Sequence, residues 1–359
     1  ARGDLKTAER LLNETLQEAE KFGAKDERLY KSLENLALIY CKIGHYQKAE
    51  PLLKRALSIR EENAGSDTTS IAQPLQNLGL VYMNEQKFDR AREVLERLLA
   101  LREKTLGKDD IEVAFTLNNL AEVYEQLNDF KKAEAMFSRS LSIREKKLGF
   151  EHEEVANSLN NLAGLYIDKE QYAKAEPLLK RSLAIQEKVA KNKETDPGLA
   201  AILTNLADLY DDIGQMDKAE PLLKRALSIN EKAYGNEHPA VAKTLSNLAC
   251  LYIDKQDFRA AAPLVERALS IAENCEDQEY PGLIEGLMEI AEMYAHYNKF
   301  AQALPVRQRI LALEEELLGK DNPELAMYVD DYAETLKRVG DREKSQAMKE
   351  RAKTLRNKR

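Results

Sequence analysis

Apolar, small and polar residues recur along this chain at a fixed interval. A block that reads Asn-Leu-Ala-x-x-Tyr begins at Asn35, and degenerate copies of it begin at Glu289 and Asp331. The copies between them begin at Asn77, Asn119, Asn161, Asn205 and Asn247, and the copy at Asn77 has Gly79 in place of Ala. Successive copies are 42 residues apart, except for one step of 44. A period of this size along a whole sequence predicts a solenoid built from one supersecondary unit.

The pattern inside one interval predicts two helices. A first apolar stripe has helical spacing and consists of Leu33, Leu36, Ala37 and Tyr40. Gly44 follows it, as a residue free to adopt positive φ at a helix end should. A second stripe then begins at Tyr46 and includes Ala49, Leu53 and Ala56. The expected unit is therefore a helical hairpin, with small residues where the two helices approach each other.

Two residue series invite a functional interpretation but favour a structural one. The Tyr at the end of the block returns seven times at one helical position, from Tyr40 to Tyr294, which is typical of packing. An Arg recurs in every second helix, from Arg55 to Arg351. It is either a basic ladder for a ligand or a set of ion pairs within the array, and we favour ion pairs. Glu50 and Lys54 illustrate a stabilising i,i+4 pair of the same kind.

The small-aromatic-small pattern around Gly44 and Tyr46 resembles the tetratricopeptide repeat. The 42-residue interval and segments such as Gly235-Asn236-Glu237-His238-Pro239 are similar to the kinesin light chain-like subtype. The resemblance covers the whole chain. It implies an all-α, right-handed α-α superhelical solenoid of about eight helix-turn-helix repeats, with first helices lining the concave side and non-enzymatic binding as the usual role.

These patterns give one expected domain, a single repeat array over 1–359. Residues 1–26 match the second half of a unit, 27–348 hold eight repeats, and 349–359 form the basic end of a polar capping helix. Because the first half of the initial unit is missing, we expect the natural protein to continue upstream.

Composition excludes several functions. The net charge of -8 argues against nucleic acid and anionic membranes as partners. Cys41, Cys250 and Cys275 cannot pair completely, which is typical of reduced thiols in a cytoplasmic protein. No His or Cys has metal-ligand spacing, and no Gly-rich phosphate loop or nucleophile motif is present. We therefore expect no catalytic, cofactor or metal site.

The first-helix positions opposite the packing stripe are rich in acids. From Phe115 to His296, 25 such positions carry nine acids and one base. Ser246 and Ile253 belong to the same set of positions. The acids are Glu122, Glu125, Asp168, Asp208, Asp211, Asp212, Asp254, Glu285 and Glu292. They predict an acidic groove for a Lys- or Arg-containing peptide, whereas grooves of the kinesin light chain type favour acidic peptides.

Amides form the second element of this predicted groove. Asn119, Asn161 and Asn205 are placed either to bond an extended peptide backbone or to join neighbouring helices, and both alternatives stay open. Asn118 and Asn160 are expected closer to the groove centre. The sequence thus favours a monomeric adaptor that binds a protein or peptide segment. The alternatives are an architectural scaffold and the regulatory repeat region of a larger protein with a missing upstream effector domain.

Overall fold

The computed structural model describes residues 2–23, 26–64, 68–274 and 280–358, and those residues form helices and turns without strands. Two short 3₁₀ turns, Thr68–Ile71 and Pro323–Leu325, precede α4 and α16. The α-helices are α1 (Arg2–Glu20), α2 (Glu27–Lys42), α3 (Tyr46–Ala64), α4 (Ala72–Asn84), α5 (Phe88–Leu106), α6 (Ile111–Gln126), α7 (Phe130–Leu148), α8 (Glu153–Asp168), α9 (Tyr172–Val189), α10 (Pro197–Asp212), α11 (Met216–Tyr234), α12 (Pro239–Asp254), α13 (Phe258–Asn274), α14 (Tyr280–His296), α15 (Phe300–Leu318), α16 (Ala326–Val339) and α17 (Arg342–Arg356).

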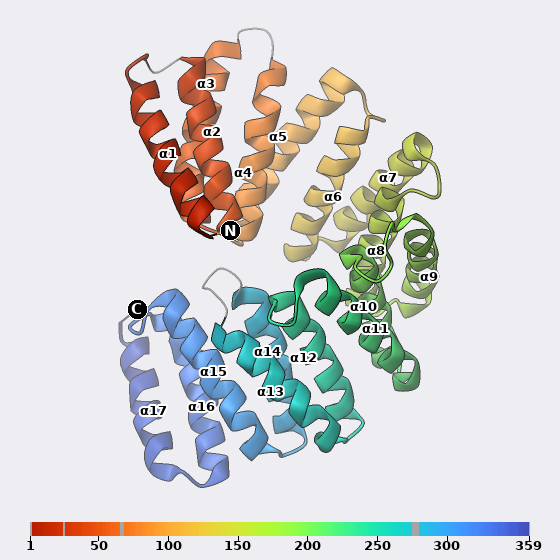
Figure 1. The fold of residues 1–359 in the computed structure, drawn as a ribbon, viewed down its shortest axis with the longest axis vertical. Helices are drawn as coiled ribbons and strands as arrows, with labels where there is room; N and C mark the ends of the chain where they lie inside the picture. The colour runs from red at the N-terminus through yellow and green to blue at the C-terminus, as the bar shows by residue number, and fades with distance from the viewer. Residues whose placement is uncertain (1, 24–25, 65–67, 275–279, 359) are drawn as a thin grey trace. The chain divides into compact units, whose positions relative to one another are not determined.

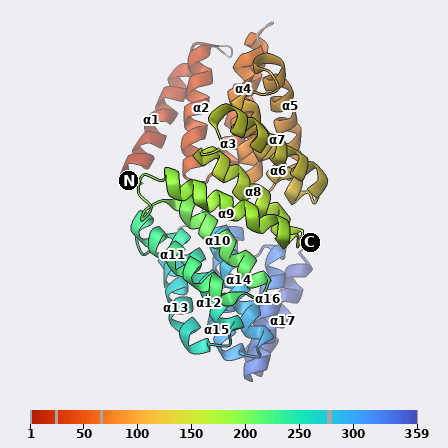
Figure 2. The ribbon, with the colours of Figure 1, turned by 90° about the vertical axis from the view of Figure 1, so that its right-hand side faces the viewer.

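The helices group into two compact units. The first unit ends at Ile185 and the second begins at Gln186, so that the boundary falls inside α9. Within each unit, consecutive helices pair as antiparallel hairpins, α2 with α3 and α10 with α11 among them (Figure 1; Figure 2). The structure confirms an all-α fold of paired helices. α1 packs against α2.

Small residues allow the two helices of a hairpin to pack closely. Ala37 and Ala49 in the first repeat have no exposed surface, and neither do Ala121 and Ala133 two repeats later. Leu53 fills the position one turn beyond Ala49 and is also fully buried. The two helices of each hairpin therefore meet along a buried apolar interface. Its residues supply the main stabilisation of the fold, at roughly 25 cal/mol per Å² of apolar surface removed from water.

Several members of the Tyr series bond the preceding second helix. The Tyr82 hydroxyl lies 3.4 Å from a carboxylate oxygen of Glu50 on the preceding second helix. Tyr166 and Glu134, 32 residues apart, repeat the contact at 2.9 Å. The ring is the apolar filler that the sequence predicts, and the hydroxyl adds a polar bond between repeats. The packing interpretation of the Tyr series is thus confirmed.

The Arg series forms ion pairs along the second helices. Arg139 Nη1 lies 2.6 Å from Glu103 Oε1, and Arg181 Nη1 lies 2.7 Å from Glu145 Oε1. Arg225 Nη1 continues the ladder, 2.6 Å from Glu187 Oε1. The predicted i,i+4 pair between Glu50 and Lys54 is also present, at 2.6 Å. The ion-pair interpretation is confirmed, because these guanidinium groups already have partners within the array.

Turns and caps follow the expected chemistry. Gly44 has φ +70° after α2, as predicted for the residue that ends a first helix. Asp196 accepts a hydrogen bond from the Leu199 backbone N–H at the start of α10, at 2.8 Å. The last repeat departs from this plan, because Pro323 opens a 3₁₀ turn and α16 begins only at Ala326.

One junction in the second unit differs from its neighbours. α12 packs on α11 and α16 packs on α15, whereas α14 packs mainly along α12. Ser246 and Ile253 have no exposed surface on α12. The sequence prediction that these two residues face a groove is wrong, because α14 covers them.

Candidate functional site

The predicted groove residues fall on first helices in both units. In the first unit, Asn118 of α6 is 8% exposed and donates a 2.7 Å hydrogen bond to Glu122 Oε1. Asn161 of α8 donates to Asn118 Oδ1 at 3.2 Å and to Glu122 Oε1 at 3.3 Å. These two amides connect successive first helices, which matches the second of the two alternatives for the recurring Asn.

Two further carboxylates accompany this amide cluster. Burial raises the pKa of Glu125 to about 7, with a contribution from the charges of Asp168 and Glu122. Burial also raises the pKa of Glu122, although the Asn118 hydrogen bond and the Arg144 charge act in the opposite direction. Asp168 lies at the end of α8 and its pKa is raised by desolvation. Among the charges that raise the pKa of Glu125, that of Asp168 has the largest effect.

The second unit holds a denser group of acids. Asp208 of α10 accepts a 3.1 Å hydrogen bond from the Asn247 amide of α12. Burial raises the pKa of Asp208 to about 7, and the charges of Glu289 and Asp212 add to the shift. Asp208 is thus a half-buried carboxyl at the junction of two repeats, with a polar partner and no salt bridge among the described residues.

Asp211 is the member of this group that has a buried oxygen atom without a hydrogen-bond partner among the described residues. That atom is Oδ1. Burial raises the pKa of Asp211 to about 6, together with the charges of Asp254 and Asp212. Asp254, in turn, accepts a 2.7 Å hydrogen bond from the Tyr297 hydroxyl.

The negative charges of these acids act on the thiol of Cys250. Burial raises the pKa of its thiol, and the charges of Glu289, Asp211, Asp208 and Asp254 raise it further. The thiol is therefore protonated and unreactive, because the thiolate is the nucleophilic form. Cys41 is also a free thiol, whereas Cys275 lies outside the described residues.

The remaining predicted residues lie on the same helices. Asn119, Asn160 and Asn205 are half-buried on α6, α8 and α10, and Asp212 is exposed at the end of α10. Sequence reasoning missed Glu289, which influences the pKa of Asp208. The signal was present, because Glu289 occupies the position that holds Asn in the six preceding copies of the block.

The arrangement contains carboxylate and amide oxygens that can accept hydrogen bonds from a cation. Among the described residues, no three His, Cys, Asp or Glu side chains gather so as to hold a metal ion. None of the described helices combines the length and the apolar character that crossing a bilayer requires. Paired helices with a polar first-helix surface define the class of helical repeat proteins that serve as interaction scaffolds.

Comparison with known proteins gives the family. The tetratricopeptide repeat family matches residues 1–62, 70–146, 137–188 and 198–274, more than half of the sequence. The chain therefore belongs to the tetratricopeptide repeat family, and its 42-residue interval is that of the kinesin light chain-like subtype, as the sequence predicts. This repeat fold is typically a non-enzymatic interaction scaffold. No curated protein matches the chain.

Solved structures show the same fold. The structure is similar to BtubC (BKLC) from P. vanneervenii, with 27% identity and a TM-score of 0.55 over 64% of this chain and 92% of that chain. The Q17M variant of a putative kinesin light chain with nearly identical TPR-like repeats, from Podosopora anserina, is 27% identical, with a TM-score of 0.48 over 56% and 94%. A Rap protein complexed with competence and sporulation factor is 16% identical, with a TM-score of 0.58 over 100% and 99%, a likeness of fold alone.

Proposed function

We propose that this interaction scaffold is an adaptor that binds a basic, extended protein segment along the acidic first-helix face. The observation that carries the proposal is the buried Oδ1 atom of Asp211, which has no hydrogen-bond partner among the described residues. The charges of Asp254 and Asp212 act on this carboxyl group, and the charge of Lys255 acts in the opposite direction. A buried carboxylate oxygen without a donor is costly, and a ligand cation would reduce that cost.

The contrast with the second helices supports the proposal. Acids there have cationic partners, as Glu145 has Arg181 and Glu187 has Arg225. The first-helix acids Glu125 and Asp211 instead have pKa values raised by burial and by neighbouring acids. The negative potential of the array is therefore concentrated on the face that carries Asn118, Asn161 and the other groove candidates.

The chemistry of the face favours a peptide over a small ligand. Successive repeats offer single carboxylates and amides rather than one deep cavity, and an extended chain can contact several of them in turn. Lys and Arg side chains would supply the charge, and the charge would mainly set the rate and orientation of binding. We further propose that the repeats act as one array, in a monomeric and cytoplasmic protein whose partners are neither nucleic acid nor membrane.

The test is a titration with fluorescein-labelled hexalysine, followed by anisotropy at about 50 mM and about 200 mM NaCl, where screening differs appreciably. Substitution of Asp208, Asp211 and Asp212 by Asn should weaken binding about tenfold at the lower salt concentration and flatten the salt dependence. A control removes three exposed acids elsewhere in the same unit, one in the turn before α12 and two on α13: Glu237→Gln, Glu266→Gln and Glu273→Gln. Equal affinity of wild type and groove variant would reject the basic-ligand proposal.

A further inference from the structure

The first two repeats depart from the acidic character of the first-helix face. Leu38 of α2 and Leu80 of α4 are 39% and 38% exposed. They stand one 42-residue interval apart, at the helix position that holds Glu122 in α6. The buried apolar stripe of these two helices consists of other residues, such as Leu36 and Leu78. Packing within the repeat therefore does not explain why the two exposed positions are leucine.

Leu38 stands where a carboxylate could accept a bond from the amide of the next first helix. Asn161 donates to Glu122 Oε1, and the two residues are 39 positions apart. The residue at the same separation before Asn77 is Leu38, and the Asn77 amide instead lies 3.5 Å from Glu34 Oε1. Leu38 thus replaces a hydrogen-bond acceptor of the face with exposed hydrocarbon.

Two half-buried residues enlarge this apolar surface. Cys41 and Met83 follow the two leucines by three positions on α2 and α4, where α6 has Glu125. Residues three apart lie on one side of a helix, so each pair presents a common surface. The apolar patch consists of Leu38, Cys41, Leu80 and Met83. It takes the place of the carboxylates that the third repeat carries.

The apolar patch belongs to a continuous face within the first unit. Side-chain amides join the first helices in pairs, since Asn77 of α4 reaches α2 and Asn161 of α8 reaches α6. Arg102 of α5 bridges the two pairs. It donates to Gln76 Oε1 on α4 at 2.6 Å and to Thr116 Oγ1 on α6 at 2.8 Å. The patch on α2 and α4 therefore adjoins the acids of α6 and α8.

The charge of the face changes at the same place. Opposite the packing stripe, α2 and α4 carry two bases, Lys31 and Lys42, and one acid, Glu34. The corresponding positions of α6 and α8 carry three acids and no base. A basic ligand side chain is therefore attracted to α6 and α8, whereas α2 and α4 offer hydrocarbon without an excess of negative charge.

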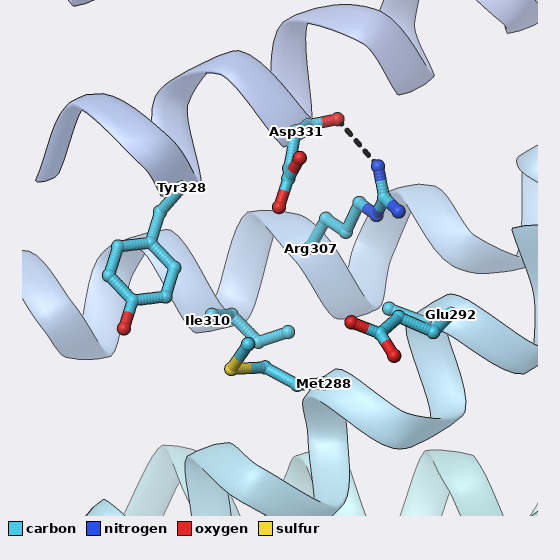
Figure 3. Close-up of a pocket in the computed structure, with 7 residues that line it drawn as sticks. Met288, Glu292, Arg307, Ile310, Tyr328 and Asp331 are labelled. Atoms are coloured by element: carbon cyan, nitrogen blue, oxygen red, sulfur yellow. Dashed lines mark hydrogen bonds between the residues drawn. The ribbon is translucent and has the colours of Figure 1, made fainter.

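The enclosed space near the end of the chain offers no comparable anchor. Met288, Glu292, Tyr328 and Asp331 surround it between α14, α15 and α16 (Figure 3). Its volume of about 20 Å³ has room for about one water molecule, and Ile310 in its lining is 4% exposed. A ligand side chain does not fit there, whereas the apolar patch is open to solvent.

We propose that the apolar patch receives the aliphatic part of the bound segment while α6 and α8 receive its basic part, an inference that rests on the proposed binding of a basic ligand. The ligand is then a segment whose aliphatic and basic residues form separate groups. Neighbouring first helices joined by side chains lie roughly 10 Å apart. An extended chain advances about 3.3 Å per residue, so about three ligand residues correspond to one repeat.

Three fluorescein-labelled peptides of one composition test this order by anisotropy. The clustered peptide is Leu-Ser-Ser-Leu-Ser-Ser-Lys-Ser-Ser-Lys, and the second peptide is its reverse. The interleaved peptide is Leu-Ser-Ser-Lys-Ser-Ser-Leu-Ser-Ser-Lys. The tighter of the first two, which reports the direction of the bound chain, should bind about tenfold more tightly than the interleaved peptide at pH 8, because a second leucine leaves water. An interleaved peptide that binds as tightly as both would overturn the inference.

Methyl signals locate the contact on the protein. In protein labelled at its leucine methyl groups, Leu38→Gln and Leu80→Gln assign the signals of these two residues. The tighter clustered peptide should shift both signals in step with binding, and hexalysine should shift them much less. Signals that stay in place at saturating peptide would overturn the assignment of the apolar patch.

A matched pair of double variants tests the energetic role of the patch. Leu38→Gln combined with Leu80→Gln should weaken binding of the tighter clustered peptide about tenfold and leave hexalysine binding unchanged, since neither substitution changes charge. Leu11→Gln combined with Leu106→Gln removes leucines that are 48% and 51% exposed on α1 and α5 of the same unit, and should have little effect.

The acid substitutions separate this inference from the general proposal. Hexalysine binding that depends on Asp208, Asp211 and Asp212, together with no effect of peptide order or of the leucine pair, rejects the apolar patch and leaves the adaptor proposal intact. Hexalysine binding that is insensitive to the three acids rejects the adaptor proposal itself.

Discussion

Asn247 donates a hydrogen bond from its side-chain amide to Asp208 Oδ1, 3.1 Å away and one repeat earlier. The bond ties α12 to α10 and holds a carboxyl group at a half-buried junction. Burial nevertheless dominates, since the pKa of Asp208 is raised to about 7. The amide therefore orients the carboxyl group without removing the cost of its charge.

Asp208 should make stability depend on pH in an uncommon direction. Its folded-state pKa of about 7 exceeds the usual value of 3.8, so the folded protein binds more protons between these limits. Its contribution should thus raise the free energy of unfolding as pH falls from about 8 to about 5. Asp208→Asn should stabilise the protein by roughly 2 kcal/mol at pH 8 and by much less at pH 5, after allowance for partial solvation.

Urea unfolding at the two pH values measures this difference. Glu237→Gln, at an exposed turn of the same unit, controls for the change in net charge. A stabilisation of the Asp208→Asn variant that is the same at both pH values would contradict the assigned pKa.

Binding of a basic ligand should weaken on acidification. The pKa values of Asp208 and Glu125 are raised to about 7 and that of Asp211 to about 6, so these groups lose charge as pH falls through that range. We expect hexalysine to bind roughly tenfold more weakly at pH 5.5 than at pH 8, where its own ammonium groups stay charged. Calorimetry in two buffers of different ionisation enthalpy should also detect proton release on binding near pH 7. Affinity that is independent of pH would exclude these carboxyls from the contact.

Two arginines on consecutive second helices should differ greatly in their effect on stability. The Arg144 side chain is 4% exposed and donates to Ser158 Oγ at 2.6 Å, whereas the Arg181 side chain is 40% exposed beside Glu145. Arg144→Ala should cost about 3 kcal/mol because it empties a buried polar site. Arg181→Ala should cost less than about 1 kcal/mol and should lose its effect in high salt.

Urea unfolding at low and high salt tests this pair. Arg144→Gln is the matched intermediate variant, because Gln186 stands at the same position of the next repeat and donates to Asp196 at 3.2 Å. If Arg144→Ala and Arg181→Ala lower the free energy of unfolding equally, burial does not determine how much these arginines stabilise the protein.

The sequence determined the hairpins but left the contacts between repeats open. Periodicity identifies which face of a helix is apolar. It correctly predicted that Ala37 and Ala49 are buried and that the Tyr series is packed between helices, with five of its seven members buried. It does not specify which neighbouring helix covers a polar face. Asn161 could therefore be assigned equally to a ligand or to the adjacent repeat, where it bonds Asn118.

The sequence was enough to predict which acids lie on the first-helix face. It was not enough to predict their raised pKa values. Counting acids on one helical face gave Glu125, Asp208 and Asp211 from spacing alone. Their raised pKa values depend on burial by neighbouring repeats, which a linear pattern does not contain.

A polar member of the buried Leu53 series was also missed. Arg307 stands at that position in the seventh repeat and bonds the Asp331 backbone oxygen and Thr335, whereas the recurring arginine of the same repeat is Arg309.

Two glycines in first helices should respond oppositely to alanine. A Cβ atom at Gly286 would lie 2.9 Å from Ser246 Cβ and Oγ, at the contact of α14 with α12. A Cβ atom at Gly164, in the interior of α8, would meet nothing within 4 Å. Gly164→Ala should stabilise the protein by about 0.5–1 kcal/mol through reduced backbone entropy. Gly286→Ala should destabilise it by roughly 1–3 kcal/mol, because α14 must move away from α12.

The Gly286 result tests the departure of α14 from the repeat geometry. If α14 packed on α13 as α12 packs on α11, Ser246 would be uncovered and Gly286→Ala would stabilise the helix as Gly164→Ala does. Unfolding midpoints of the two variants distinguish these cases. The double variant Gly286→Ala with Ser246→Gly should recover most of the loss, since removing the serine side chain restores the space that the new methyl group needs.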